Sequence, residues 1–342
     1  MHWQLEKRSS IFSHMMSVHR YESILKPLAK FTILAFFSIW SFGLLFPLNA
    51  AAAQWVKTIA KNDPQTPDGT VVLKDVPYVT NGHDRQKLDL LVPMSEEKLP
   101  LLVWIHGGGW EAGDKEDRAF YRFLNQGFAV ASINYRFSQH AIYPAQIEDC
   151  KAAIRWLRAH SEEFGLDPEK IAAGSASAGG HLVALLAATG HTRMFDKGEY
   201  LEESSRIQAA CDFFGPTDFT DYDFQDTIFK DPDDSPLSRL VGGTVTQKIA
   251  LLSLASPLCF VTSTHAPIII IHGNKDNLVP LNQSQRYLDA LAQANVESTL
   301  LIMDNQGHGF EGENYWREIS TFFEKKLKPE KRVGYTKLLL IP

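Results

Sequence analysis

Short apolar runs alternate with segments of helical periodicity along most of this sequence. Residues 88–92 and 128–133 each predict a strand, and residues 101–105, apolar at every position, predict a strand buried on both faces. Between residues 146 and 164, apolar side chains recur at steps of three and four, which predicts a helix that stops before Gly165. The same signals predict further strands at 170–174, 209–214, 267–271 and 298–303, and further helices at 180–188, 284–294 and 315–327.

This alternation of strands and helices predicts one α/β domain from residue 54 to residue 327. Strands that alternate with helices form a mostly parallel sheet, because each connecting helix packs onto one of its faces. We therefore expect a central sheet covered by helices on both faces. Residues 218–241, rich in Asp and Pro, interrupt the alternation and predict an insertion near the mouth of a site. Residues 328–342 follow the last helix as a tail of unassigned role.

The amino-terminal segment, residues 1–53, has the composition of an export signal. An uncharged apolar run at 31–46 follows several basic residues and precedes a run of alanines. A basic flank, an apolar core and small residues are the parts of a secretory signal peptide, and we expect cleavage after Ala53. The alternative is an uncleaved membrane anchor through residues 31–50, since a span needs about 20 apolar residues. Either reading predicts an exported protein, periplasmic or secreted, with membrane contact only if the segment stays uncleaved.

Charge and cysteine content exclude some classes of protein. The formal net charge is −6 and no Lys/Arg-rich run appears, so no nucleic-acid partner is expected. Cys150, Cys211 and Cys259 are too few for a disulfide framework and too widely spaced for a zinc site, so no metal is expected. We expect them to be small buried side chains, with a single disulfide as the alternative in an exported protein.

A serine between a predicted strand and a predicted helix is the candidate nucleophile. Residues 171–181 read IAAGSASAGGH, so two serines compete for the role. A nucleophile elbow admits only small residues two positions before and after its serine. Ser177 has Ser175 before it and Gly179 after it, whereas Ser175 would have no Gly at either place. We therefore predict Ser177 as the nucleophile, with Ser175 as a tolerated variation of the usual first Gly.

A run of three glycines directly after His106 predicts an oxyanion hole. Glycines carry no side chains, so their N–H groups can approach the negative charge that develops in acyl transfer. The alternatives are a flexible loop or a phosphate cradle, but the residues from Trp110 onward lack the Lys and Ser or Thr that a cradle needs. His106 is expected to shape the loop and not to carry protons. The expected donors are the N–H groups of Gly107, Gly108, Gly109 and Ala178.

Two turns that follow predicted strands supply the candidate acid and base, Asp276 and His308. His308 lies between two glycines, where a general base has room to move. It would take the proton of Ser177, while Asp276 would hold the imidazole in the correct tautomer. Asp304 is the alternative acid, but it is too close to His308 in sequence to reach around it easily. Of the other histidines, His272 is expected to support the turn that carries the acid.

Seven motifs lie along the chain: His106-Gly-Gly-Gly-Trp110, Tyr135-Arg136, Asp167-Pro-Glu-Lys-Ile171, Ser177-Ala-Gly-Gly-His181, Phe214-Gly-Pro-Thr-Asp218, His272-Gly-Asn-Lys-Asp276 and Gly307-His308-Gly309. Together these motifs resemble the esterase/lipase branch of the α/β-hydrolases, nearest to the hormone-sensitive-lipase-like and bacterial feruloyl-esterase-like carboxylesterases. The order Ser, Asp, His along the chain is also the order of that superfamily. The resemblance runs from about residue 70 to residue 325. It implies an α/β-hydrolase fold with a mostly parallel sheet of about eight strands, and no cofactor.

The sequence and the resemblance together predict a serine hydrolase that cleaves carboxylic esters through an acyl-enzyme. The expected substrates are short-chain acyl esters or sugar and phenolic esters, whether small molecules or carbohydrate-linked. Aromatic residues near the motifs, Trp110, Phe214 and Tyr222, are expected to contact the substrate. An amide or peptide hydrolase with the same three residues is the first alternative. A non-catalytic binding protein of this fold is the second, although such proteins usually lack one of the three.

Overall fold

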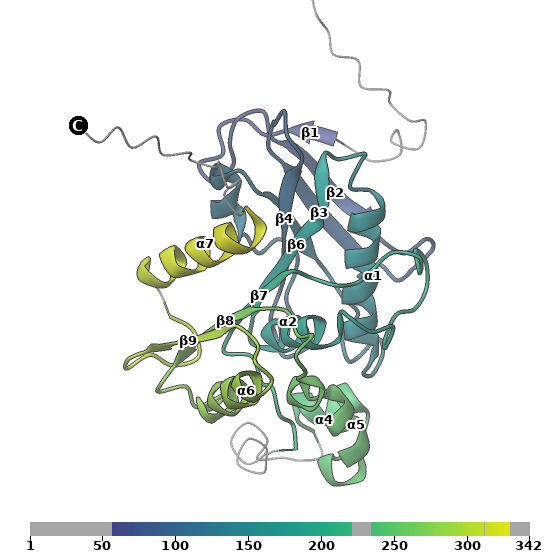
Figure 1. Cartoon of the computed structure of the whole chain (residues 1–342). Helices are drawn as coiled ribbons and strands as arrows, with labels where there is room; N and C mark the ends of the chain where they lie inside the picture. The colour runs from purple at the N-terminus through teal and green to yellow at the C-terminus, as the bar shows by residue number, and fades with distance from the viewer. Residues whose placement is uncertain (1–56, 221–233, 311, 329–342) are drawn as a thin grey trace, which may run out of the picture. The chain divides into compact units, whose positions relative to one another are not determined.

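The computed structural model describes residues 57–220, 234–310 and 312–328 (Figure 1). Within these residues a nine-stranded sheet has the order β1-β2-β3-β5-β4-β6-β7-β8-β9. The strands are β1 (Lys57–Ile59), β2 (Val71–Pro77), β3 (Lys87–Val92), β4 (Leu99–Ile105), β5 (Ala129–Ile133), β6 (Leu166–Ala176), β7 (Ala209–Phe213), β8 (Ile268–Gly273) and β9 (Ser298–Met303).

The sheet is parallel from β5 to β9, and its first strands pair antiparallel. This confirms the predicted mostly parallel sheet, with nine strands against the expected eight or so. No strand was predicted at β1 or β2. All three residues of β1 are exposed, and in β2 the polar residues Lys74 and Asp75 coincide with a break in the register between Leu73 and Val76. Neither strand therefore has an unbroken apolar alternation for a sequence pattern to detect.

Helices cover both faces of the sheet, as predicted. Strand β4 shows why: Leu101, Val103 and Ile105 pack into the core that includes α1 and α2, while Leu102 and Trp104 pack into the core that includes α7. Figure 1 shows α1 and α2 on one side of the strands and α7 on the other. The helices are α1 (Ala145–Ala159), α2 (Ala178–Thr189), α4 (Pro236–Val241), α5 (Ile249–Ala255), α6 (Asn282–Gln293) and α7 (Asn314–Leu327).

The carboxyl end of α1 corrects the predicted helix over 146–164, which was too long. The helix ends at Ala159, and residues 160–165 form turns that lead into β6. Leu166 begins β6 four residues before the predicted start and pairs with Leu99. Phe164 keeps the apolar periodicity because its side chain is still buried, although it lies in a turn.

Several predictions fall wholly or partly outside the described residues. The predicted export segment 1–53 lies outside them, as does the tail at 328–342 apart from its first residue. Of the predicted insertion, residues 221–233 lie outside, and its end forms helix α4, which Ser235 caps by accepting a hydrogen bond from the Ser238 N–H. Within the described ranges, no helix has both the length and the apolar content that a membrane crossing requires.

All three cysteines are free thiols. Cys150 and Cys211 are buried as predicted, but Cys259 is exposed, so the prediction of a third buried cysteine was wrong. Cys259 lies in a short 3-10 helix, Pro257–Phe260, whose one buried residue is Pro257. The other side chains of this turn can therefore reach solvent.

A buried group of charges anchors the loop that follows α2. Lys151 of α1 donates hydrogen bonds to the carbonyl oxygens of Thr189, Thr192 and Met194, at 2.7 to 3.2 Å. Asp196 neutralises it from 3.5 Å and also pairs with Arg155 at 3.0 Å. The Lys151 and Arg155 side chains are fully buried, so the loop carboxylate is their charge partner inside the protein.

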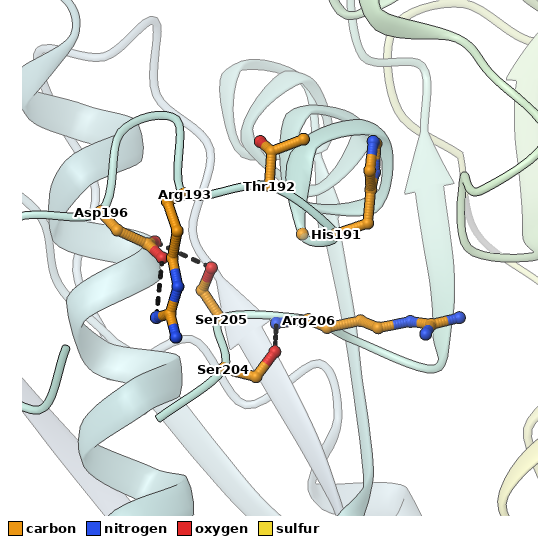
Figure 2. Close-up of a pocket in the computed structure, with 8 residues that line it drawn as sticks. His191, Thr192, Arg193, Asp196, Ser204, Ser205 and Arg206 are labelled. Atoms are coloured by element: carbon orange, nitrogen blue, oxygen red, sulfur yellow. Dashed lines mark hydrogen bonds and ion pairs between the residues drawn. The ribbon is translucent and has the colours of Figure 1, made fainter. Parts of the chain in front are cut away.

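Figure 2 shows a hollow that is lined by this loop and by residues 204–206, which precede β7. Its volume is about 310 Å³. Asp196 turns its carboxylate toward Arg193 and Ser205, so the polar groups drawn at its centre are bonded to one another. None of its lining residues is a predicted site residue. We therefore interpret this hollow as a consequence of how the loop is anchored.

Replacing Asp196 with Ala should lower the free energy of unfolding by about 3 kcal/mol or more, because it leaves two cations buried without their carboxylate. Urea unfolding followed by fluorescence measures the change. Asp289→Ala, an exposed carboxylate on α6, is the matched control and should change the free energy by less than about 0.5 kcal/mol. Equal effects of the two substitutions would contradict the anchoring role of Asp196.

Candidate active site

Ser177 occupies the turn between β6 and α2 with an unusual backbone conformation. Its φ is 57° and its ψ is −126°, a region that residues with a side chain rarely adopt. The turn is held by the Ser177 N–H, which donates to the Phe213 carbonyl oxygen at 2.8 Å. Gly179 lies so close to β4 that a Cβ on it would come within 2.6 Å of the His106 carbonyl oxygen. The packing therefore demands the small residue that the sequence provides there.

The two competing serines differ in their surroundings. Ser175 is fully buried, and its hydroxyl donates to the Ile105 carbonyl oxygen on β4. Ser177 lines the cavity described below and is partly exposed. Of the two hydroxyls, that of Ser177 is the one that a substrate can reach.

Ser177, His308 and Asp276 form one chain of hydrogen bonds. His308 Nε2 lies 2.9 Å from Ser177 Oγ, and its Nδ1 lies 2.7 Å from Asp276 Oδ2. A carboxylate only accepts hydrogen bonds, so Nδ1 carries the proton and Nε2 is free to accept the proton of the serine hydroxyl. This is the geometry that activates a serine for nucleophilic attack.

The carboxylate of Asp276 is buried yet well supplied with donors. Its Oδ1 accepts hydrogen bonds from the N–H groups of Leu278 and Val279, both at 2.9 Å. Burial by itself would raise the pKa of Asp276, but hydrogen bonds from His272, His308 and the Val279 N–H outweigh it and hold the pKa well below its usual range. Asp276 is therefore an anion at any pH at which a histidine base can act.

His272 and Asp304 have the positions that the sequence suggested for them. His272 Nε2 lies 2.8 Å from the Val279 carbonyl oxygen and its Nδ1 lies 2.7 Å from Ser284 Oγ, so it supports the turn that carries Asp276. Asp304 accepts hydrogen bonds from the side chains of Asn274 and Asn305. Its carboxylate is bonded within its own turn and has no hydrogen bond to His308 among the described residues.

The glycine loop after β4 presents free N–H groups beside Ser177. Gly108 and Gly109 have φ values of +102° and +61° and line the same cavity as Ser177. No acceptor among the described residues is hydrogen-bonded to either N–H. Ala178 is the first residue of α2, so its N–H has no partner within the helix. Gly107 does not line the cavity, and its carbonyl oxygen instead contacts the His106 side chain.

The cavity that joins these groups has a volume of about 450 Å³ and is mainly apolar. Trp110 forms part of its wall but is almost fully buried. Its Nε1 donates a hydrogen bond to His181 Nδ1 at 3.1 Å. The centroid of the Phe214 ring lies 4.5 Å from the centroid of the His308 ring. Tyr222 lies outside the described residues. The lining is Gly108, Gly109, Trp110, Ser177, Ala178, Phe214, Pro216, Pro236, Leu278, Val279 and His308.

Sequence reasoning missed four of these lining residues. Leu278 and Val279 directly follow the predicted acid, so their place beside it was a usable signal. Pro216 lies in the motif that begins at Phe214 and was not singled out. Pro236 comes from α4, at the end of the segment 218–241 that was predicted to lie near the mouth of a site, but Pro236 itself was not singled out.

The histidine that follows the Ser177 turn supports the wall of the cavity through its hydrogen bond with Trp110. His181 is fully buried and lies 2.7 Å from the Ala255 carbonyl oxygen through its Nε2. Burial lowers its pKa to about 4, so it is neutral and its Nδ1 accepts the hydrogen bond from Trp110. Asp218 does not line the cavity; it accepts a hydrogen bond from the Thr220 N–H and pairs with Arg286.

No group of three or more His, Cys, Asp or Glu residues in the described ranges is arranged to hold a metal ion. Ser177 and His308 line the cavity together with Gly108, Gly109 and Ala178, and Asp276 is hydrogen-bonded to His308. This arrangement of side chains and backbone N–H groups can perform acyl transfer.

A family model described as BD-FAE matches residues 88–291, which is more than half of the chain. The probable carboxylic ester hydrolase LipM of Mycobacterium tuberculosis is 35% identical over 203 residues, covering 58% of this chain and 46% of LipM. The esterase LipQ of the same organism is 29% identical over 246 residues, covering 69% of this chain and 57% of LipQ. The chain thus spans about half the length of the curated relatives that it matches.

Solved structures of esterases resemble this chain over a larger share of its length. A truncated carbohydrate esterase from gut microbiota superposes with a TM-score of 0.70 at 28% identity, over 79% of this chain and all of that one. The propionate-bound esterase Est2 of Thermogutta terrifontis superposes with a TM-score of 0.61 at 25% identity, over 78% of this chain and 97% of that one.

Proposed function

The chain belongs to the BD-FAE family of α/β-hydrolases, and from this premise we propose that it hydrolyses carboxylic esters through an acyl-enzyme on Ser177. The observation that carries the proposal is the chain of hydrogen bonds from Ser177 through His308 to Asp276, at the edge of an apolar cavity. The names of the relatives, carboxylic ester hydrolases and esterases, support an ester in place of an amide.

In the first half of the proposed reaction, Ser177 Oγ attacks the carbonyl carbon of the ester while its proton passes to His308 Nε2. The carbonyl oxygen becomes an anion and accepts hydrogen bonds from the N–H groups of Gly108, Gly109 and Ala178. The imidazolium is stabilised by the buried Asp276 carboxylate. When the intermediate collapses, the bond to the alcohol oxygen breaks, His308 returns the proton to that oxygen, and the acyl group remains on Ser177.

The second half repeats these steps with water. His308 Nε2 takes a proton from a water molecule, whose oxygen attacks the acyl carbon. Collapse of the second intermediate releases a carboxylic acid and returns the proton to Ser177 Oγ. The same three residues and the same N–H donors therefore serve both halves.

The cavity supports an ester with an apolar acyl group. Its lining is mainly apolar, and its volume of about 450 Å³ lies in the range of small-molecule sites. The alcohol part can then be a simple alcohol, a sugar or a phenol. A carbohydrate esterase among the structural neighbours supports testing acetylated sugars and feruloyl esters beside simple esters.

Ser177→Ala should lower kcat for p-nitrophenyl acetate by about 10⁴-fold or more, because it removes the nucleophile. Ser175→Ala is the matched control, since it removes a neighbouring hydroxyl that is buried, and should keep most of the activity. Circular dichroism of both variants verifies the fold. If Ser175→Ala is the inactive variant, the register of the elbow is wrong.

Asp276→Asn should lower kcat by about 10⁴-fold, because an amide can present a donor to His308 Nδ1 and favour the wrong tautomer. Asp304→Asn, which changes the other nearby carboxylate, should have little effect. Steady-state kinetics on p-nitrophenyl butyrate measure both variants. Strong inactivation by Asp304→Asn with little effect of Asp276→Asn would transfer the acid role to Asp304.

We propose further that the protein is exported, on the support of the basic flank, apolar run and alanines within residues 1–53. Expression of the full chain followed by cell fractionation and amino-terminal sequencing tests this. A mature protein that begins at residue 54 is the expected result. Recovery of the intact chain with the membranes would favour the anchor through residues 31–50, and recovery of it in the cytoplasm would contradict export.

A further inference from the structure

The first glycine of the loop is tied to the histidine before it. His106 is buried at the end of β4, and its Nδ1 lies 2.8 Å from the Gly107 carbonyl oxygen. A carbonyl oxygen only accepts, so Nδ1 must carry a proton for this contact to be a hydrogen bond. The ring is held from its face by Tyr135, with ring centroids 4.5 Å apart.

The other ring nitrogen of His106 faces an arginine. Arg85 Nη2 lies 2.9 Å from His106 Nε2. A guanidinium has donors only, so Nε2 must be the acceptor and must carry no proton. Arg85 therefore selects one neutral tautomer of His106, with the proton on Nδ1.

Arg85 is itself held in a fixed position. Its Nε donates to the Tyr135 carbonyl oxygen at 3.2 Å, its Nη1 pairs with Asp114 at 3.2 Å, and its Nη2 also donates to the Gly113 carbonyl oxygen at 3.0 Å. Its guanidinium lies 3.8 Å from the centroid of the Phe137 ring. The donor that meets His106 is therefore aimed by contacts on several sides.

The direction of the Gly107 carbonyl decides the direction of the next N–H. In a trans peptide the C=O and N–H bonds point to opposite sides. A hydrogen bond that draws the Gly107 oxygen toward His106 thus turns the Gly108 N–H away from His106, and Gly108 lines the cavity beside Ser177. Glycines have no Cβ to restrict this peptide, so an outside contact has to hold it.

We propose that Arg85 is a positioning residue of this esterase site, which fixes the tautomer of His106 and thereby aims the Gly108 N–H at the oxyanion. The inference rests on the proposed esterase function. Arg85 does not line the cavity, and none of its hydrogen bonds within the described residues goes to Ser177; it acts through His106 and Gly107. It lies before the matched family region and in none of the motifs quoted from the sequence.

The protonation of His106 gives this role a distinctive signature. Burial lowers the pKa of His106 to about 4; the hydrogen bond to Gly107 and the carboxylates of Asp114 and Asp117 oppose the shift, and Arg85 adds to it. His106 is therefore neutral at pH 7. Without Arg85, the proton can move to Nε2, and the bare Nδ1 then faces the Gly107 oxygen. Full protonation at lower pH puts a proton back on Nδ1 and restores the contact.

The test compares Arg85→Met, Arg85→Lys and the wild type on p-nitrophenyl acetate between pH 4 and pH 8. Arg85→Met should lower kcat at pH 8 by about 10²-fold, the effect of losing one oxyanion donor, with little change in KM. Its kcat relative to wild type should rise as the pH approaches 4, because His106 then gains a second ring proton and Nδ1 is protonated again. Arg85→Lys keeps a donor for His106 Nε2 and should recover part of kcat at pH 8.

Asp114→Asn is the matched control, because it removes the charge partner of Arg85 but leaves the donor to His106 in place. Its kcat should stay within a few-fold of wild type at every pH. A ratio for Arg85→Met that does not change with pH, or a change in KM alone, would overturn the proposal. Ser177→Ala separates this from the proposed function: if that variant keeps its turnover, the esterase assignment itself fails.

A measurement on the unmodified protein covers the case in which Arg85→Met does not fold. Nuclear magnetic resonance of protein with ¹⁵N-labelled histidine reports which ring nitrogen of each histidine is protonated. The signals of His106 are assigned by their loss in His106→Asn. A proton on Nδ1 near pH 7 supports the proposal, and a proton on Nε2 contradicts it.

Discussion

The candidate site depends on one constrained backbone conformation, that of Ser177. A residue with a side chain at φ 57° and ψ −126° costs about 1–3 kcal/mol and persists only where its surroundings enforce it. Here the enforcement comes from β6, which lies between β4 and β7, and from the hydrogen bond between the Ser177 N–H and the Phe213 carbonyl oxygen. The same turn that lifts the hydroxyl out of the sheet also begins α2, so the free N–H of Ala178 lies beside the serine.

The parallel order of the strands gathers the other groups at the same edge of the sheet. The glycine loop follows β4, Ser177 follows β6, Asp276 follows β8 and His308 follows β9, and these four strands run parallel. The carboxyl ends of parallel strands lie together, which is where open α/β sheets bind ligands. Groups that lie far apart along the chain therefore meet without any long excursion of the backbone.

Two buried ionisable groups of the site, Asp276 and His106, are held in different charge states. On one side, Asp276 is buried and remains an anion because donors surround both of its oxygens. On the other side, His106 is buried and remains neutral. Burial favours its uncharged form, and Arg85 donates a hydrogen bond to Nε2, the ring nitrogen that a second proton would occupy. In each case a group taken out of water is kept in one protonation state by hydrogen bonds of fixed direction. His308, the base of the proposed mechanism, is hydrogen-bonded to Asp276.

The sequence by itself determined the features that local patterns encode. Apolar runs located most of the parallel strands, because a buried strand needs apolar side chains on both faces. Small neighbours distinguished Ser177 from Ser175, because a tight elbow has no room for larger ones. The turns carrying Asp276 and His308 were also evident, since each directly follows such a strand.

Only the tertiary structure decided the features that depend on contacts across the sheet. The edge strand β1 and its neighbour β2 pair through backbone groups that no side-chain pattern reveals. The contact of Arg85 with His106 depends on how loops pack, and Arg85 stands in no distinctive local pattern. The segment that contains Pro236 was predicted near the site, but which of its residues lines the cavity was decided by the packing of α4. Periodicity reports which side chains are buried, whereas the partner of a buried polar group is set by elements distant in sequence.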